Sequence, residues 1–181
     1  MMKYYVNTPL SDDFIEKLEC GDVVYINGTV YSARDAAHKR LVEMAEDGKE
    51  LPFDIKNQIV YYLGPTPARP GRAIGSAGPT TSSRMDKYTP TLLKMGLKGM
   101  IGKGRRSDKV VESIIENKAV YLLATGGAGA LLSDCIKESE IIAFDDLGTE
   151  AIRKLRVENF PVIVGIDSKG NDLYKQVEEI R

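Results

Sequence analysis

The stretch that decides the fold is residues 96–127, GLKGMIGKGRRSDKVVESIIENKAVYLLATGG. Short apolar runs lie near its two ends, and between them the apolar residues of SDKVVESIIENK (107–118) recur at helical spacing. The two apolar runs do not alternate with polar residues, which is typical of strands that are covered on both faces. This order of strand, helix and strand predicts two neighbouring parallel strands.

The same alternation continues toward the C-terminus. We expect a helix over 130–138 (ALLSDCIKE), a strand over 139–148 (SEIIAFDDLG), a helix over 149–158 (TEAIRKLRVE) and a strand over 160–170 (FPVIVGIDSKG). The second half of the chain is therefore expected to form a mainly parallel sheet.

The N-terminal side begins differently. Residues 22–32, DVVYINGTVYS, contain two β-rich runs around Asn27-Gly28, a pair suited to the positive φ angles of a type I′ turn, so we predict a β-hairpin. A helix is expected to begin close to Arg34 and Asp35 and to stop at Gly48. The predicted fold class is α/β, with one domain over residues 1–181, an N-terminal β-hairpin layer and a mainly parallel sheet in the second half.

A long segment without apolar periodicity separates the two halves. It follows a predicted strand at 58–63 (QIVYYL) and reads GPTPARPGRAIGSAGPTTSSR (64–84). A loop this long inside a compact domain is usually functional or disordered. The next helix is predicted to begin at Thr89-Pro90, because proline is well suited to a first helical position.

The composition excludes several classes of protein. With 181 residues, 43% of them hydrophobic, and a formal net charge of −1, the chain is neither disordered nor a globally basic nucleic-acid binder. No apolar run approaches the roughly 18 residues of a membrane span, and MMKYYVNTPL lacks the apolar core of a secretory signal. We therefore expect a cytosolic protein that contacts no membrane. Cys20 and Cys135 are too few for a metal-ligand pattern in this chain.

The near-zero net charge hides a cationic segment. Residues 64–107 hold nine basic side chains and a single acid, Asp86, so this segment carries +8 and the rest of the chain −9. Such a segment attracts anions. Tyr88 is its only aromatic residue, which is too few for base stacking, so we expect a small anionic substrate rather than nucleic acid. A basic surface without a dedicated ligand is the alternative.

Two motifs within this segment carry recognisable chemistry. Gly78–Arg84, GPTTSSR, places four hydroxyl groups beside a guanidinium, which can hold a carboxylate bidentately. A hydroxyl-rich helix cap is the other interpretation. Lys103, between Gly102 and Gly104, follows a predicted strand, where open α/β sheets bind their ligands.

Two further features favour structural roles. Thr125–Ala130 lies between a predicted strand and a helix, as a dinucleotide-binding turn does, but Leu132 stands where that fingerprint has Gly or Ala. We favour a tight turn of small residues there, although its backbone N–H groups could still hold a carboxylate. The lone His38, near Arg34, is interpreted as a packing or capping residue on its helix.

Taken together, four words resemble the C-terminal domain, or separate β subunit, of class I fumarases and the related L-tartrate dehydratases. They are ARDAAHKR (33–40), GSAGPTTSSRMD (75–86), GKG (102–104) and DLG with EAI (146–148 and 150–152). The resemblance implies a swivelling β/β/α domain. It also implies a partner α subunit that holds a [4Fe-4S] cluster through three cysteines, with no cofactor bound by this chain alone. The active site would lie between the two.

The resemblance also assigns roles to individual residues. Thr80 and Lys103 match catalytic positions, with Thr80 at the place of the proposed base, whereas Arg34, Thr81 and Arg84 match positions that bind the two carboxylates of the substrate. An aliphatic hydroxyl is a poor base and needs cationic neighbours that support its deprotonated form. The sequence departs from the family at residue 83, where a serine replaces the usual glycine.

The resemblance implies reversible hydration of fumarate to L-malate by a heteromer. Two alternatives stay open, namely the β subunit of an L(+)-tartrate dehydratase and a non-catalytic module that binds small anions. The sequence does not choose between fumarate and tartrate, because both present two carboxylates to the same cations.

Overall fold

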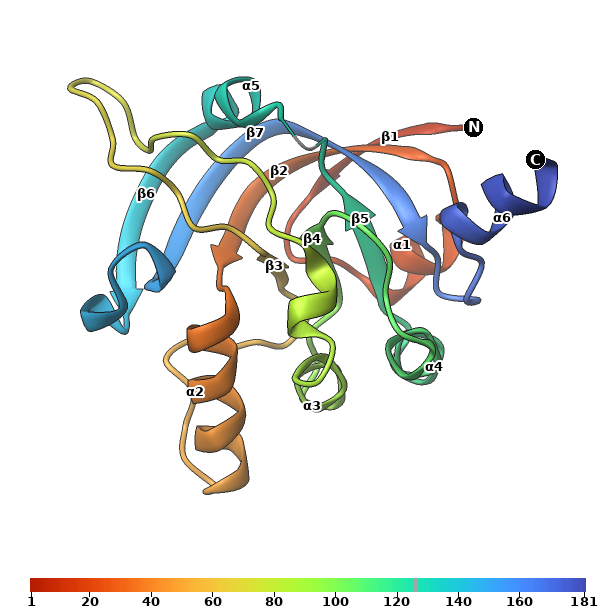
Figure 1. Ribbon diagram of the computed structural model, residues 1–181, viewed down its shortest axis with the longest axis horizontal. Coiled ribbons are helices and arrows are strands. Elements are labelled where there is room, and N and C mark those ends of the chain that lie inside the picture. Colours follow the sequence, from red (N-terminus) through yellow and green to blue (C-terminus); the bar gives the residue numbers. More distant parts are fainter. Residues whose placement is uncertain (126) are drawn as a thin grey trace.

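A computed structural model of the protein describes residues 1–125 and 127–181 (Figure 1). Its strands are β1 (Lys3–Asn7), β2 (Val23–Ser32), β3 (Ile59–Tyr61), β4 (Gly99–Gly102), β5 (Val120–Leu123), β6 (Ile136–Ala143) and β7 (Ile152–Ile166). Its helices are α1 (Asp12–Lys17), α2 (Asp35–Glu46), α3 (Thr89–Lys94), α4 (Asp108–Asn117), α5 (Gly129–Asp134) and α6 (Leu173–Ile180), with 3₁₀ turns η1 (Ser82–Met85) and η2 (Asp145–Glu150). Among the described residues, no helix combines the length and the apolar character that crossing a bilayer requires.

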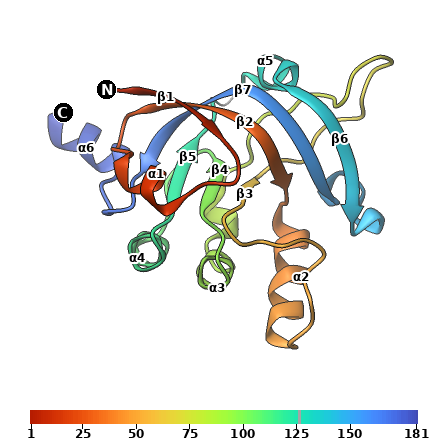
Figure 2. The same ribbon diagram turned by 180° about the vertical axis from the view of Figure 1, so that it is seen from behind.

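The strands form one mixed sheet in the order β1-β2-β3-β4-β5-β7-β6. The pairs from β1 to β5 along this order are parallel, whereas β7 runs antiparallel to β2, β5 and β6. Because β2 also pairs with β7, the strands β2, β3, β4, β5 and β7 close into a barrel-like ring, with β1 and β6 added at its sides. The helices α2, α3 and α4 lie on the same side of this sheet (Figures 1 and 2).

The central strands are buried on both faces. In β3, the side chains of Ile59 and Tyr61 pack into the core enclosed by the ring, whereas Val60 packs with Leu92 of α3 and Ile114 of α4. Full burial of a side chain of this size stabilises the fold by about 1.5–3 kcal/mol. This two-sided burial explains why the apolar runs of these strands do not alternate with polar residues.

Several predictions are confirmed. The chain has a mixed α/β fold, the strands β4 and β5 are parallel neighbours, and α4 connects them. The helix predicted after Arg34 is α2, which begins at Asp35 and ends just before Gly48. Residues 64–80 form no regular helix or strand, and α3 begins at Thr89 with Pro90 in its first turn.

The predicted hairpin at 22–32 is wrong, because this stretch is the single strand β2. Gly28 does adopt a positive φ of 111°, but it lies at a shift in register between β2 and β7 rather than in a turn. There the Thr8 side chain approaches so closely that a Cβ on Gly28 would lie 2.4 Å from its Oγ1. The Thr8 Oγ1 accepts the Thr29 N–H at 2.6 Å, so the glycine permits a close contact across the sheet.

The second half is less parallel than predicted. Residues 149–158, predicted as a helix, form the end of η2 and the start of β7, and β7 pairs antiparallel with each of its three neighbours. The strand predicted over 139–148 begins earlier, at Ile136, and ends at Ala143. The buried residues Ile152, Leu155 and Val157 satisfy both helical and strand spacing, so pairing with β2 decided the outcome.

Candidate functional site

The residues predicted to bind and process a substrate follow the ends of parallel strands. Strand β2 ends two residues before Arg34, and β4 ends just before Lys103. The long loop begins at the end of β3, and we use the name carboxyl edge for the edge where β2, β3, β4 and β5 end. Loops that follow neighbouring parallel strands converge at such an edge, which is where open α/β sheets bind ligands.

The long loop returns to the carboxyl edge between β3 and β4. The Thr80 N–H donates to the Tyr62 carbonyl oxygen at 2.8 Å, and Thr81 forms an isolated parallel bridge with Lys103. The Ser82 N–H then donates to the carbonyl oxygen of Lys103 at 2.9 Å. The structure therefore brings Thr81 and Lys103 side by side and attaches Thr80 directly to the end of β3.

The glycines around Lys103 are required by this packing. A Cβ on Gly102 would lie 1.9 Å from Ser82 Oγ, and Gly104 adopts a positive φ of 84°. The Tyr121 hydroxyl hydrogen-bonds with Ser82 Oγ at 2.7 Å and with the Gly104 carbonyl oxygen at 2.8 Å. Burial raises the pKa of Tyr121, so its hydroxyl keeps its proton. Side chains on both sides thus hold the Lys103 turn in place.

The two predicted guanidiniums meet at one carboxylate. Arg84 Nε donates to Asp35 Oδ2 at 2.8 Å, and Arg34 Nε lies 3.9 Å from Asp35 Oδ1. The side chains of Arg34, Asp35 and Arg84 are 22%, 32% and 52% exposed, so this cluster is open to a ligand. Arg34 also lies over the backbone at the end of β3, where a Cβ on Gly64 would be 2.7 Å from Arg34 Nη1.

The N-terminal turn of α2 is held by groups from a distant segment and by His38. The Glu150 carboxylate of η2 accepts the Ala36 N–H at 3.2 Å. The backbone N–H of His38 donates to the Arg34 carbonyl oxygen, and His38 Nδ1 lies 2.7 Å from the same oxygen. Burial lowers the pKa of His38 to about 4, so the ring is neutral at pH 7 and Nδ1 carries the proton in this contact. His38 is thus a packing and capping residue, as predicted.

The cationic segment proves to be partly neutralised within the fold. Its fully buried member, Arg106, donates through Nε to Asp86 at 2.7 Å and through Nη2 to Thr89 Oγ1 at 2.8 Å. Three further members of the segment also contact carboxylates, in the pairs Arg72–Asp134, Lys98–Asp12 and Arg105–Glu178. The segment is therefore no uniform anion-binding surface, and the argument for a ligand rests on the residues at the carboxyl edge.

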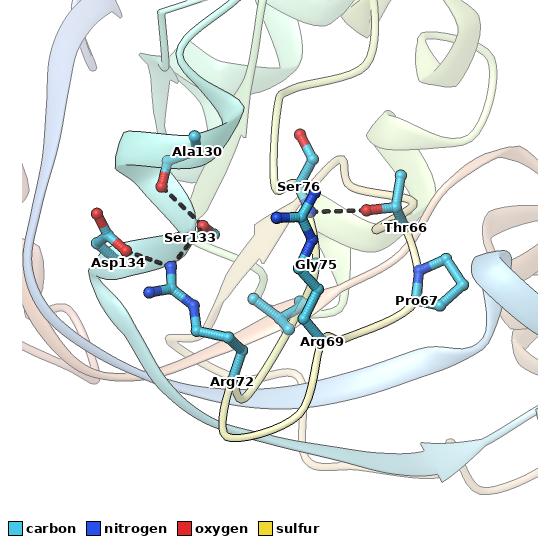
Figure 3. A pocket seen from close by; sticks show the side chains of 10 residues that line it. Thr66, Pro67, Arg69, Arg72, Gly75, Ser76, Ala130, Ser133 and Asp134 are labelled. Carbon is cyan, nitrogen blue, oxygen red and sulfur yellow. Dashed lines mark hydrogen bonds and ion pairs between the residues drawn. The ribbon is translucent and has the colours of Figure 1, made fainter.

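A hollow of about 470 Å³ lies beside the long loop (Figure 3). The loop residues Thr66, Arg69 and Ser76 line one wall, and Ser133 and Asp134 of α5 line the other. None of the five predicted site residues lines this hollow. The predicted residues instead lie on a more open part of the carboxyl edge, where another molecule would have to complete an enclosed site.

The turn predicted at Thr125–Ala130 includes Gly126, which lies outside the described residues. At its end, the Ala77 N–H donates to the Gly129 carbonyl oxygen at 3.1 Å, and a Cβ on Gly129 would lie 2.2 Å from Ser76 Oγ. The end of this turn therefore packs closely against the long loop, which agrees with the prediction that small residues serve close packing here.

The two thiols do not form a metal site. Cys20 Sγ contacts the Gly165 carbonyl oxygen and Cys135 Sγ contacts that of Asn159, six residues away along β7. Burial raises the pKa of both thiols, that of Cys20 to about 11. Iron–sulfur clusters need several thiolate ligands close together, so these cysteines do not fit one. Among the described residues, no group of three or more His, Cys, Asp or Glu could hold a metal ion.

Some contacts at the carboxyl edge were not predicted from the sequence. Asp35 was noted only as a neighbour of Arg34, and its contact with Arg84 spans 49 residues. Tyr121 lies in an apolar strand and gives no local signal of its contact with the Lys103 turn. The family words at 146–152 do have a visible purpose, since η2 docks on α2 through Glu150 and through the ion pair Arg40–Asp146.

Known proteins resemble this chain along most of its length. The family model described as Fumarase C-terminus matches residues 2–177. "Putative L(+)-tartrate dehydratase subunit beta" of Methanocaldococcus jannaschii is 38% identical over 184 residues, which cover 98% of this chain and 94% of that protein. "Fumarate hydratase class I, anaerobic" of Escherichia coli K12 is 42% identical over 154 residues, which cover 84% of this chain and 28% of that protein. "Fumarate hydratase 2" of Leishmania major is 40% identical over 158 residues, or 86% of this chain and 28% of that protein. The chain thus matches little more than a quarter of the length of these fumarate hydratases, and it belongs to the fumarase C-terminus family.

Proposed function

We propose that this chain is the β subunit of a hydro-lyase that interconverts fumarate and L-malate together with a separate α subunit. One observation supports this most strongly. The cations Arg34, Arg84 and Lys103 and the hydroxyls of Thr80 and Thr81 all come to the carboxyl edge, in a member of the fumarase C-terminus family. This edge offers a dicarboxylate several positive charges and hydroxyl donors at once.

In this proposal, the two guanidiniums bind carboxylate oxygens. Arg84 uses Nε for its contact with Asp35, and its terminal amino groups stay available for a bidentate contact. Thr81, fixed beside Lys103 by the backbone bridge, adds a hydroxyl donor to the same carboxylate. These preorganised positive charges stabilise the negative charge that builds up when a proton leaves the carbon next to a carboxylate.

Thr80 is proposed to handle that proton, with Lys103 as the neighbouring cation. The backbone of Thr80 is fixed to the end of β3, and the Lys103 turn is held by Thr81, Ser82 and Tyr121. A cation close to a hydroxyl favours its deprotonated form, which is what a threonine needs in order to act as a base. Thr80 and Lys103 are therefore the proposed catalytic residues, and Arg34, Thr81 and Arg84 the proposed binding residues.

The family cofactor is assigned to the partner, because the cysteines of this chain do not fit an iron–sulfur cluster. When bound by the α subunit, a [4Fe-4S] cluster supplies a Lewis acid for substrate oxygens. The relative from M. jannaschii is named a subunit beta, which supports a partner encoded as a separate chain. A single swivelling domain over residues 1–181 and a cytosolic location are part of the same proposal.

L(+)-tartrate is the second candidate substrate. The observation that favours it is the match to nearly the whole length of the tartrate dehydratase subunit, whereas each of the two fumarate hydratases is matched over only 28%. Tartrate carries the same two carboxylates as malate, so the cations of the carboxyl edge would serve it equally well. The choice rests on which acid the assembled enzyme turns over faster.

The test is reconstitution. The purified chain is mixed without oxygen with an iron–sulfur α subunit encoded in the same genome, and turnover of fumarate, L-malate and L(+)-tartrate is measured for each chain and for the mixture. We expect activity only in the mixture, with fumarate and L-malate as the better substrates. Faster turnover of tartrate would establish the second candidate instead. Binding of dicarboxylates without turnover of any of the three acids would leave a non-catalytic anion-binding module.

A further inference from the structure

We propose that Asp35 is a positioning residue that holds the guanidiniums of Arg34 and Arg84 in one arrangement for a substrate with two carboxylates. This inference rests on the proposed function, because it concerns the same residues at the carboxyl edge. Asp35 was expected only as a neighbour of Arg34 at the start of a helix. Its position between two arginines gives it a more specific role.

The geometry places one carboxylate between two cations from separate segments. Asp35 Oδ2 accepts the Arg84 Nε–H at 2.8 Å, and Asp35 Oδ1 lies 3.9 Å from Arg34 Nε. Both contacts involve Nε rather than the terminal amino groups. Each guanidinium is therefore oriented by its inner nitrogen, while its outer amino groups stay available for an incoming carboxylate.

The charge of Asp35 allows the two arginines to stay close to each other. Two guanidiniums repel at short range, and a carboxylate between them offsets this repulsion. Arg34 follows β2 and Arg84 belongs to η1, so no local backbone hydrogen bond fixes their distance from each other. The contacts of Asp35 supply that link directly between the side chains.

One half of the link is incompletely closed. Arg34 Nε and Asp35 Oδ1 are both buried, and neither has a hydrogen-bond partner among the described residues. Their separation of 3.9 Å is too long for a hydrogen bond. Buried polar atoms without partners are unfavourable, so a small movement of Arg34 that closes this gap is favoured. A carboxylate bound to the outer face of Arg34 would hold it in the closed arrangement, since catalytic contacts often tighten when a ligand binds.

A purely structural role makes a different prediction. Asp35 is the first residue of α2, where an acidic side chain stabilises any helix through the helix dipole. Asp12 provides a matched control, because it is the first residue of α1 and pairs with Lys98 Nζ at 3.1 Å. The helix α1 lies near the opposite end of the strands, next to the start of β4, so Asp12 makes no contact at the carboxyl edge.

The test compares Asp35→Asn and Asp35→Glu with Asp12→Asn. Binding of L-malate and of a one-carboxylate analogue, propionate, is measured by calorimetry on the chain assembled with its α subunit, and kcat and KM for fumarate are measured alongside. We expect Asp35→Asn to weaken malate binding by about tenfold and to raise KM, with a smaller effect on propionate and on kcat. Asp35→Glu should restore part of the affinity, and Asp12→Asn should bind malate like the wild type.

Each outcome decides one of the two claims. Unchanged malate binding by Asp35→Asn would overturn the positioning role, whatever the turnover. An equal loss of affinity for malate and propionate would also overturn it, because Asp35 would then act on a single carboxylate site. If the wild-type complex binds malate in an Asp35-dependent manner but turns over none of the acids, the positioning role stands and the proposed enzymatic function fails.

Discussion

Lowering the pH should destabilise this protein through one identifiable group, the imidazole of His38. The ring is completely buried, and its Nδ1 lies 2.7 Å from the Arg34 carbonyl oxygen. Its Nε2 is buried and has no partner among the described residues, so a second proton would place an uncompensated charge in the core. Burial is the largest cause that lowers the pKa to about 4, Arg106 adds to it, and the Arg34 carbonyl and Asp35 oppose it.

The sign and the size follow from this pKa. In the unfolded chain His38 has its ordinary pKa of 6.5, so between pH 6.5 and about 4 the unfolded state binds a proton that the folded state does not. The stabilisation is therefore complete above pH 6.5 and is lost as the pH falls toward 4. Each pH unit in this window corresponds to about 1.4 kcal/mol, so we expect a loss of about 2 kcal/mol at about pH 5 relative to pH 7.5.

The assay is urea unfolding of the chain at these two pH values, followed by circular dichroism. Carboxylates also titrate in acid, so the comparison is with His38→Gln, whose amide can donate to the Arg34 carbonyl oxygen but does not titrate. The wild type should lose about 2 kcal/mol more than the variant. Because His38 is the only histidine, its ring protons can also be followed directly by NMR. Equal losses in both proteins, or a midpoint near 6.5 in the NMR titration, would refute the reasoning.

Three further predictions concern the carboxyl edge in the assembled enzyme. Thr80→Val removes only a hydroxyl and should lower kcat by about 10²–10⁴ with little change in KM, and steady-state kinetics with a normal kcat would remove its catalytic role. Arg84→Ala should raise the dissociation constant for L-malate by about tenfold in calorimetry, whereas Arg156→Ala, on exposed β7, should not; equal effects would mean that binding is diffuse. Gly102→Ala introduces a Cβ that would lie 1.9 Å from Ser82 Oγ and should destabilise the chain by about 1–3 kcal/mol in urea unfolding, unless that side chain can move away without loss.

The sequence predicted best the elements that depend on local pattern. The strands β3, β4 and β5 are buried on both faces, so their apolar runs are continuous and easy to find. The helix α2 has a clear start after Arg34 and a glycine stop. The hairpin failed because Asn27-Gly28 is an equally good signal for a turn and for a bulge, and the choice depends on β7, which lies about 130 residues further along the chain.

The same limit applies to the candidate site. Lys103 could be placed at the carboxyl edge because the position follows from the strand that precedes it. The contact of Asp35 with Arg84 could not be predicted, since it joins residues 49 apart through their side chains. Nor could the sequence show that Arg106 is buried against Asp86 while Lys103 stays exposed, because all basic residues of the segment look alike before the chain folds.

The central claim, that the carboxyl edge of this chain forms half of a hydro-lyase site, is tested most directly at Lys103. The measurement is kcat/KM for fumarate in the complex reconstituted without oxygen, with wild-type chain, Lys103→Ala and the exposed control Lys94→Ala, after gel filtration has shown that each complex assembles. We predict turnover by the wild type and by Lys94→Ala, and a fall of about a hundredfold or more for Lys103→Ala, because the cation beside Thr81 is lost. Wild-type kcat/KM in the assembled Lys103→Ala complex would contradict the account.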